Sequence, residues 1–353
     1  MSRLLAPLAA GFKLGVAIRR AAYRRGWFKS HRLNRPVVSV GNLTAGGTGK
    51  TPIVRYIAEI LLKSGWRPSI LTRGYGRRDG GKMIVLEPAA ERKADPGKVG
   101  DEPALLAQSL PELPIMVCTN RYRAGRLAEE RFDVNVHILD DGFQHWALAR
   151  DVDVVLLDVT QELSDQALLP AGRQREPCSA LERAHIVVLT RTELGDPQPL
   201  EDRVREISPN ASIFHCSTRL CELVDIRNGR VFPPTAFNGE PVHAFCGIGN
   251  PRAFFADLRK WGMSLVSETS FSDHVVYRNR EADRHIAGML LTLRLTKSTV
   301  AAFVTTEKDV AKLTKGVKSP VPVLACVIRS EIHEAAEFEE TLISHLEAAR
   351  ERN

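Results

Sequence analysis

The sequence has few aromatic residues and no close pairs of cysteines. Aromatic residues make up 6% of the 353 residues, so we expect a core built mainly of aliphatic side chains. The six cysteines are scattered, and no two of them form a C-x-x-C pair. This spacing gives no support to a structural zinc site or a disulfide framework, and it is typical of reduced thiols in a cytosol.

The N-terminal segment lacks the length needed to cross a bilayer, which takes about 20 apolar residues. Its apolar run, LLAPLAAGFKLGVAI at residues 4–18, is interrupted by a proline and a lysine. On a helical wheel an apolar face is separate from a basic face, with Leu5, Leu8, Phe12, Val16 and Tyr23 on the first and Lys13, Arg20 and Arg24 on the second. We therefore expect residues 1–30 to form an amphipathic basic helix on a membrane surface. The alternative is an ordinary helix packed on its own domain.

The chain carries an excess of positive charge. Its formal net charge is +7 and its isoelectric point is about 9.2, which indicates an anionic partner: a phosphate compound, an acidic membrane surface or nucleic acid. A nucleic-acid-binding protein would interleave basic and aromatic residues on one face, and outside the N-terminus this sequence does not. We therefore expect no nucleic-acid partner, and nothing in the sequence indicates an obligate protein partner.

A glycine-rich segment, GNLTAGGTGKT at residues 41–51, lies between a strand-like run and a helix-like run. This is the context in which a G-x-x-x-x-G-K-[ST] loop binds nucleotide phosphates, although Thr44 stands where the generic pattern has glycine. Glycines let successive N–H groups point inward, and a helix beginning near Lys50 adds positive charge. We expect nucleotide binding by Thr44, Ala45, Gly46, Gly47, Thr48, Gly49, Lys50 and Thr51. Lys50 would reach the phosphates, and the Thr51 hydroxyl would bind Mg²⁺. The alternative is a glycine-rich turn with an incidental lysine.

Strand-like and helix-like segments alternate along the chain. Short apolar runs predict buried strands at 35–40, 68–72, 82–87, 114–118, 136–140, 151–158 and 184–190. Amphipathic stretches predict helices at 51–65, 101–110 and 121–132. We expect an α/β fold: a P-loop NTPase-like, mostly parallel sheet with helices on both faces, plus a smaller C-terminal α/β domain.

The domain boundaries are predicted from a turn signal. Two β-prone arms flank Asn228-Gly229, which is a strong hairpin signal. We expect a kinase-like core at 31–221, a β-hairpin linker at 222–233 and the smaller domain at 234–353. That domain would end in an amphipathic helix.

Two carboxylates follow a predicted strand in VHILDDGFQH. Asp140 and Asp141 stand where a P-loop enzyme needs an acidic partner for its metal, so one of them should hold Mg²⁺ directly or through water. The alternative is a solvated acidic turn.

Transfer of phosphate to an alcohol needs a base near the acceptor. Asp101 and Glu102 begin a predicted helix, and Asp273-His274 lies in the second domain. Sequence distance does not show that these groups meet, and by spacing alone each site is more typical of a helix cap or a core histidine.

A nucleotide switch, such as a P-loop GTPase or metallochaperone, is an alternative function. It would carry a guanine-specifying [NT]-K-x-D element. TEKD at residues 306–309 has its lysine and aspartate adjacent, so the pattern fails.

Several motifs together resemble one family. SVGNLTAGGTGKT, LTRGYGR, GDEPALLA, NRYRAG, DDGFQH, LLPAGRQREP, SDH and TTEKDVAKL occur in this order. The set resembles the tetraacyldisaccharide 4′-kinases, membrane-surface kinases of lipid A biosynthesis in Gram-negative bacteria. The match extends from the N-terminal helix to about residue 315. A small hydroxyl residue at the first loop position is usual in that family, which accounts for Thr44.

The resemblance implies phosphorylation, by ATP, of the 4′-hydroxyl of a lipid-linked, tetraacylated glucosamine disaccharide 1-phosphate, giving lipid IVA. It implies a peripheral (monotopic) enzyme on the anionic cytoplasmic face of the bacterial inner membrane. Asp101 would be the base, assisted by His274, with Lys50 acting on the phosphate and Asp140 and Asp141 completing the metal site. The disaccharide and its phosphate would contact Tyr75, Arg121, Gln144, His145, Arg175 and Glu176. As alternatives, Arg175 and Glu176 would pair with each other, and Tyr75 would be a packing residue.

Overall fold

The computed structural model describes residues 2–77, 81–89, 94–164, 168–272, 288–289, 299–310, 313 and 319–352. The chain divides into two compact units. The first contains Met1–Ser217 and Ser330–Asn353, and the second contains Thr218–Arg329.

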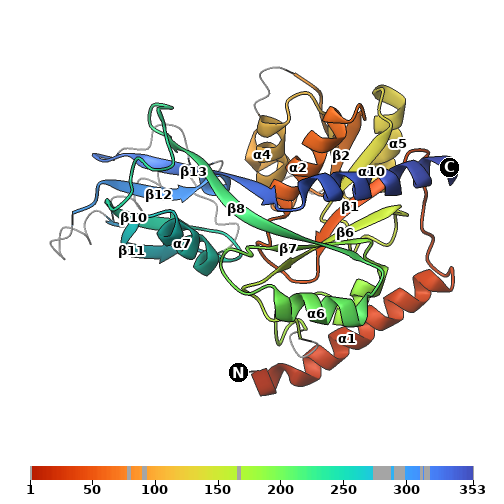
Figure 1. The fold of residues 1–353 in the computed structure, drawn as a ribbon. Coiled ribbons are helices and arrows are strands. Elements are labelled where there is room, and N and C mark those ends of the chain that lie inside the picture. Colours follow the sequence, from red (N-terminus) through yellow and green to blue (C-terminus); the bar gives the residue numbers. More distant parts are fainter. Residues whose placement is uncertain are drawn as a thin grey trace. The chain divides into compact units, whose positions relative to one another are not determined.

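The first unit is built on a mostly parallel sheet (Figure 1). Its strands follow the order β8-β7-β6-β1-β5-β2-β4-β3. They are β1 (Val37–Asn42), β2 (Pro68–Thr72), β3 (Ile84–Leu86), β4 (Ile115–Val117), β5 (Val136–Asp140), β6 (Val152–Asp158), β7 (Ile186–Thr190) and the first part of β8 (Ser212–Asp225). Only the edge pairing of β3 with β4 is antiparallel among the strand pairs described in this unit. Because β1, β5, β6 and β7 are parallel, their carboxyl ends meet at one edge of the sheet.

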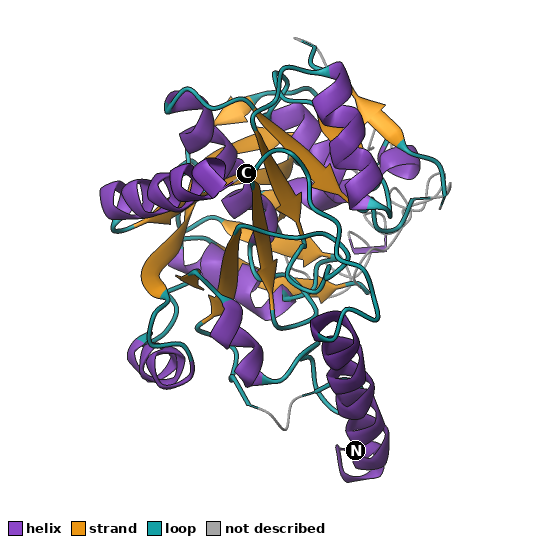
Figure 2. Ribbon diagram, turned by 90° about the vertical axis from the view of Figure 1, so that its right-hand side faces the viewer, coloured by secondary structure: helices purple, strands orange, loops and turns teal. Residues whose placement is uncertain are grey.

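Helices cover both faces of this sheet, as predicted (Figure 2). On one face, Ile57 of α2 (Lys50–Lys63) and Leu106 of α4 (Asp101–Ser109) pack with Val38 in one buried cluster. On the other face, Ala124 of α5 (Arg121–Arg131) packs with Leu139. The helices of this unit are α2 (Lys50–Lys63), α3 (Pro96–Val99), α4 (Asp101–Ser109), α5 (Arg121–Arg131), the 3₁₀ helix η2 (Cys178–Arg183), α6 (Gln198–Ile207) and α10 (Ala335–Arg352), besides α1. The α/β class and the P-loop kinase-like fold are confirmed.

The second unit has a smaller parallel sheet. Its strand order is β11-β10-β12-β13, from β10 (Pro241–Cys246), β11 (Ser264–Ser270), β12 (Ala302–Thr306) and β13 (Val323–Ile332). Phe254 and Leu258 of α7 (Pro251–Lys260) pack on Val242 of this sheet, and α9 (Glu307–Val310) follows β12. The predicted hairpin is present: β9 (Val231–Phe232) pairs antiparallel with the end of β8.

The division of the chain differs from the expected one at its C-terminal end. Residues 330–353 belong to the first unit, although we expected all of 234–353 in the second. The reason is packing: Phe338, Leu342 and Leu346 of α10 are buried in the same cluster as Ile57 of α2. An amphipathic stripe predicts that a helix packs, but it does not identify the surface. The unit boundaries also fall inside β8 and β13.

The N-terminal segment forms one helix, α1 (Ser2–Arg24), whose N-terminal end projects from the first unit (Figures 1 and 2). Tyr23 stacks on Trp146 with ring centroids 6.2 Å apart, and Arg20 pairs with Glu182 at 3.3 Å. These contacts attach the C-terminal half of the helix to its own unit. No helix in the described ranges has the length and apolar character to span a membrane.

We had expected the apolar residues of α1 to lie on one side of the helix, but they do not. Phe12 and Val16 are half-buried, whereas Leu8, Leu14 and Ile18 are 57–61% exposed. The helix therefore packs through one apolar stripe and presents a second apolar stripe to solvent. A helical wheel alone does not separate two such stripes, because it contains no information on the packing partner.

Candidate active site

The phosphate-loop segment lies between β1 and α2, as the sequence predicted. Gly46 and Gly49 have φ values of 117° and 81°, which only glycine adopts without strain, and Lys50 begins α2. The residues expected to bind nucleotide, 44–51, all lie in this loop or in the first turn of α2. In the described chain, no hydrogen bond uses the N–H groups of residues 46–49. These groups and the N-terminal end of α2 together suit a bound phosphate.

Thr44 stands where the generic loop has glycine, and its surroundings explain why glycine is not needed. Thr44 forms an isolated antiparallel bridge with Gln174. On either side, Ala45 N donates to Arg173 O at 2.6 Å and Arg175 N donates to Leu43 O at 2.7 Å. The entry to the loop is thus a short β-ladder, which a threonine side chain accommodates well.

The predicted carboxylates lie at the end of β5, close to this loop. Thr72 donates to Asp140 Oδ2 at 2.9 Å, and Asp140 is 2% exposed. Burial, with the charges of Glu102 and Asp141, raises the pKa of Asp140 to about 7. Asp140 is therefore a buried carboxyl with two other carboxylates nearby.

Asp141 has the opposite electrostatic environment. Its carboxylate lies 2.9 Å from Arg175 Nη1 and 3.5 Å from Lys50 Nζ. Burial by itself would raise the pKa of Asp141, but the charges of Lys50 and Arg175 outweigh this and hold the pKa at about 2. The two adjacent carboxyls thus differ in charge: Asp141 is ionised at neutral pH and Asp140 is poised between its two forms. A solvated acidic turn is excluded, because Asp140 is buried.

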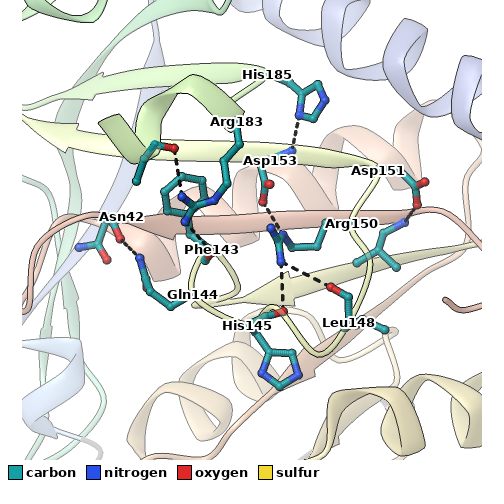
Figure 3. Close-up of polar contacts among 12 residues, drawn as sticks. Asn42, Phe143, Gln144, His145, Leu148, Arg150, Asp151, Asp153, Arg183 and His185 are labelled. Carbon is teal, nitrogen blue, oxygen red and sulfur yellow. Dashed lines mark hydrogen bonds and ion pairs between the residues drawn. The ribbon is translucent and has the colours of Figure 1, made fainter. Parts of the chain in front are cut away.

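Asn42, the last residue of β1, links the loop to the carboxylate turn, and sequence reasoning missed it. Its amide nitrogen donates to the Thr48 hydroxyl at 2.8 Å. Its amide oxygen accepts from Lys50 at 3.3 Å and from Arg175 at 3.1 Å. Gln144 donates to the Asn42 carbonyl oxygen at 3.0 Å (Figure 3). No motif singles out this asparagine, although its place at a strand end before the loop is a usable signal.

Arg175 and Glu176 do not pair with each other, contrary to the alternative left open above. Arg175 bonds to Asp141, Asn42 and Gln144. The Glu176 carboxylate, which is 3% exposed, accepts from Arg183 at 2.7 Å. The Arg183 guanidinium also lies over the Phe143 ring, 3.6 Å from its centroid, and donates to the Phe143 carbonyl oxygen (Figure 3). Arg183 therefore holds the turn that carries Gln144.

Positive charge gathers around His145 and Arg121. Arg121, the first residue of α5, is 6% exposed and donates to the Thr119 carbonyl at 3.1 Å. Burial and the nearby Arg73 lower the pKa of Arg121, against the opposing charges of the two aspartates. Burial, then Arg121 and Arg150, lower the pKa of His145 to about 3, so its ring is neutral at physiological pH. This cationic group suits an anionic ligand.

Tyr75 and Asp101 lie on two segments that pack closely together. Gly100, directly before α4, has a φ of 98°, and a Cβ placed there would lie 2.8 Å from the Tyr75 carbonyl oxygen. Tyr75 is 62% exposed, so it is not a packing residue. Asp101 and Glu102 occupy the first turn of α4, and Glu102 acts electrostatically on Asp140. His274, the predicted partner of Asp101, lies outside the described residues.

Comparison with known proteins shows the family of this chain. The sequence pattern of the family described as "LpxK: Tetraacyldisaccharide-1-P 4'-kinase" matches residues 1–347. A protein named tetraacyldisaccharide 4'-kinase from Geobacter metallireducens is 40% identical over 312 residues, covering 88% of each chain. Another from Geobacter sulfurreducens is 37% identical over 342 residues, covering 97% of this chain and 93% of that one.

A solved structure is also similar. It is that of LpxK from Aquifex aeolicus, described as an "apo" form in complex with ATP. It matches with a TM-score of 0.75 and 30% identity over 98% of this chain and 99% of that one. The chain therefore belongs to the tetraacyldisaccharide 4′-kinase family.

Proposed function

We propose that this chain is a tetraacyldisaccharide 4′-kinase, which transfers the γ-phosphate of ATP to the 4′-hydroxyl of tetraacyldisaccharide 1-phosphate and so gives lipid IVA in lipid A biosynthesis. The observation that carries the proposal is the meeting of three groups at one sheet edge: the N–H groups of residues 46–49, Lys50, and the carboxyls of Asp140 and Asp141. Phosphoryl transfer needs such an arrangement, because its catalysis is mainly positioning and charge stabilisation. Family membership supplies the substrate.

The nucleotide occupies the loop formed by residues 44–51. Because Ala45 N is bonded to Arg173, the N–H groups that receive phosphate oxygens begin at Gly46. Lys50, whose side chain is 12% exposed, stands beside them and interacts with the phosphates. Its present contacts, with Asn42 and Asp141, keep the ammonium in place before the nucleotide binds.

Thr51, Asp140 and Asp141 would hold Mg²⁺. Their oxygen donors suit a small hard cation, and the close approach of Asp140 and Asp141, with Glu102 nearby, is a charge arrangement that a divalent cation relieves. When bound, the ion neutralises charge on the transferred phosphoryl group. Arg175 orients Asp141 through its two hydrogen bonds.

Asp101 accepts the proton of the sugar hydroxyl, with His274 assisting. Asp101 lies in the first turn of α4, beside Glu102, whose charge reaches the metal carboxylate Asp140. This neighbourhood supports Asp101 as the base, because a general base must lie close to the hydroxyl that loses its proton. The exposed Tyr75 ring stands on the segment packed against Gly100 and meets the disaccharide.

The anionic disaccharide binds at the cationic group described above. Arg121 and the neutral His145, with Arg73 nearby, supply charge and hydrogen bonds for a phosphate or sugar. Gln144 and Arg175 lie between this group and the phosphate loop. Glu176 contributes to the substrate site indirectly: it binds Arg183, which holds the turn at Phe143.

The lipid acceptor requires the enzyme to work at a membrane surface, and α1 supplies the contact. Leu8, Leu14 and Ile18 form an exposed apolar stripe, and Trp27 and Phe28 are 69% and 53% exposed. Basic residues flank these groups, which suits the anionic cytoplasmic face of the inner membrane. The protein is thus a peripheral enzyme that takes its substrate from the bilayer.

The direct test is transfer of labelled γ-phosphate from ATP to the tetraacyldisaccharide 1-phosphate in detergent micelles. We expect a doubly phosphorylated lipid that forms only with both substrates present, and negligible ATP hydrolysis without lipid. The variant Lys50→Ala, with Lys63→Ala as its control on the same helix, assigns the activity to this loop. Phosphate release to water at the same rate with and without lipid would contradict the proposal and favour a nucleotide switch.

A further inference from the structure

Arg191 has an unusual backbone conformation at the end of β7. Its φ is 60°, in the left-handed region, and the strand ends at the preceding residue, Thr190. Residues other than glycine rarely adopt this conformation, since it costs free energy, and they keep it only where surrounding contacts hold it. The Arg191 side chain makes such contacts.

The Arg191 guanidinium connects the phosphate loop to a buried carboxylate. Its Nη1 atom donates to Asp158 Oδ2, at the end of β6, and to the Gly47 carbonyl oxygen at 3.2 Å. The Arg191 side chain is 11% exposed and that of Asp158 is fully buried. A buried ion pair has fixed geometry, so Arg191 holds Gly47 at a fixed place.

The Asp158 carboxylate is itself held in position. It accepts from the Thr160 N–H at 3.0 Å, from the Thr160 hydroxyl at 2.6 Å and from Gln161 Nε2 at 2.9 Å. The hydroxyl of Thr190 lies 3.3 Å from the next loop carbonyl, that of Thr48, and shares its donor with the Leu157 carbonyl at the same distance. Two successive carbonyl oxygens of the loop are therefore bonded to the ends of β6 and β7.

These bonds determine which way the loop peptides face. A peptide group points its carbonyl and its N–H in opposite directions. When the Gly47 and Thr48 carbonyls are bonded toward β6 and β7, the N–H groups that follow them, those of Thr48 and Gly49, are turned away from that side. No hydrogen bond within the described chain uses these two N–H groups. They are thus available to phosphate oxygens.

We propose that Arg191 is a positioning residue for the nucleotide: with Asp158 it fixes the orientation of the Gly47 peptide, so that the phosphate loop is already formed before ATP binds. The inference rests on the proposed use of this loop for ATP. Arg191 acts through the loop backbone, and its effect is on ATP binding rather than on lipid binding or the chemical step.

The test compares Arg191→Gly, Arg191→Lys and the parent chain. Glycine keeps the left-handed backbone without strain but removes the guanidinium, whereas lysine keeps a cation that reaches one partner. We expect Arg191→Gly to raise the Kd for a non-hydrolysable ATP analogue and the KM for ATP about tenfold or more, the loss expected for a hydrogen bond made by a charged group. Arg191→Lys should recover part of this. The KM for the lipid disaccharide should stay within about twofold, as for a distant and independent site.

A matched control distinguishes positioning from general loss of stability. Arg227 pairs with the buried Asp225 at 2.7 Å in the second unit, so Arg227→Gly also removes the arginine partner of a buried aspartate. We expect both glycine variants to lower the melting temperature, and only Arg191→Gly to weaken binding of the ATP analogue. If Arg191→Gly does not fold, Thr190→Val removes the hydroxyl that contacts the Thr48 and Leu157 carbonyls but leaves Arg191 in place. It should weaken analogue binding in the same direction, by a smaller factor.

The outcomes separate this inference from the function on which it rests. If the parent chain bound no ATP analogue, the proposed function would fail. If the parent bound it and Arg191→Gly and Thr190→Val bound it equally well, only the role of Arg191 would be overturned. An equal rise in the KM for ATP and the KM for lipid would also overturn that role, because it would indicate a general structural effect.

Discussion

The Lys50 ammonium lies 3.5 Å from Oδ1 of Asp141, which joins the first turn of α2 to the end of β5. The same ammonium donates to a third element, to the Asn42 amide oxygen at the end of β1. Under the proposed function, a cation that links the phosphate loop to the Asp141 carboxylate stands where charge changes during phosphoryl transfer. Its removal should therefore affect nucleotide use before anything else.

We predict that Lys50→Ala weakens binding of an ATP analogue by a factor of roughly 10 to 100, because bonds from a charged donor contribute about 1.5–3 kcal/mol. Titration calorimetry with the analogue measures this directly. Lys63→Ala, in the last turn of the same helix, is the control and should bind normally. Normal analogue binding by Lys50→Ala would place the phosphates elsewhere.

Replacement of the proposed base, Asp101, should separate the chemical step from nucleotide binding. Asp101→Asn keeps the shape of the side chain but removes its ability to accept a proton, so we expect kcat to fall about 100-fold to 10,000-fold. The Kd for the ATP analogue should remain unchanged. Steady-state kinetics with the lipid acceptor, beside the exposed control Glu112→Gln, checks both expectations. Turnover near that of the parent would remove Asp101 from the mechanism.

The charge state of Asp140 predicts a pH dependence. Its pKa is about 7 in the folded protein, against an ordinary value of 3.8, so the folded state binds this proton more tightly than the unfolded state does. Without metal, stability should therefore decrease as pH rises from about 4 to about 7 and then level off. Denaturant unfolding across this range, in the presence of a chelator, measures the effect, and Asp140→Asn should abolish it.

The Mg²⁺ requirement should also depend on pH, because the ion competes with the proton for the Asp140 carboxylate. We predict that the Mg²⁺ concentration for half-maximal activity rises as pH falls below about 7, the pKa of this carboxyl. Asp141, with a pKa of about 2, contributes no such dependence at these pH values. An Mg²⁺ requirement that stayed constant between pH 5.5 and 8 would exclude Asp140 as a ligand.

Thr44→Gly tests why the loop departs from the generic pattern. Thr44 lies in a β-bridge with Gln174, so glycine should lower the free energy of unfolding by about 0.5–1 kcal/mol, through its greater freedom in the unfolded chain. We expect no gain in affinity for the ATP analogue. Tighter binding by the glycine variant would contradict this expectation and show that threonine weakens nucleotide binding at this position.

The exposed stripe of α1 should determine attachment to membranes. Leu14 is 61% exposed, and burial of a leucine side chain contributes about 1.5–3 kcal/mol, so Leu14→Glu should reduce partition into anionic vesicles by a factor of roughly 10 to 100. Vesicle sedimentation measures it. Val266→Glu, at another exposed apolar side chain, is the control. Activity on a short-chain, micellar acceptor should be retained.

Much of the fold was predictable because the first unit alternates short apolar strands with amphipathic helices. The strands that the sequence did not indicate have a physical reason. Residues 264–270, SLVSETS, form β11, yet every residue of this strand is exposed or only partly buried, so it has no apolar run to mark it. The surface on which a helix packs is harder to predict than the helix itself. A helix was predicted at α10, but only the structure shows that Phe338 joins the core of the first unit.

The candidate site was predictable where a motif carries its own chemistry, as at Lys50 and the aspartate pair. It was not predictable where a residue acts through a contact distant in sequence. Asn42 and Arg183 hold the loop and the turn by bonds to residues up to 133 positions away, and the sequence does not show these partners. The different pKa values of Asp140 and Asp141 also depend on burial and on Arg175, which become apparent only in three dimensions.

The most direct measurement is a crystal structure of the protein with Mg²⁺ and a non-hydrolysable ATP analogue. The account predicts phosphate oxygens on the N–H groups of residues 46–51, the ion at Asp140, Asp141 and Thr51, and the terminal phosphate open toward Asp101. A loop without nucleotide, or a terminal phosphate separated from Asp101 by protein, would contradict it.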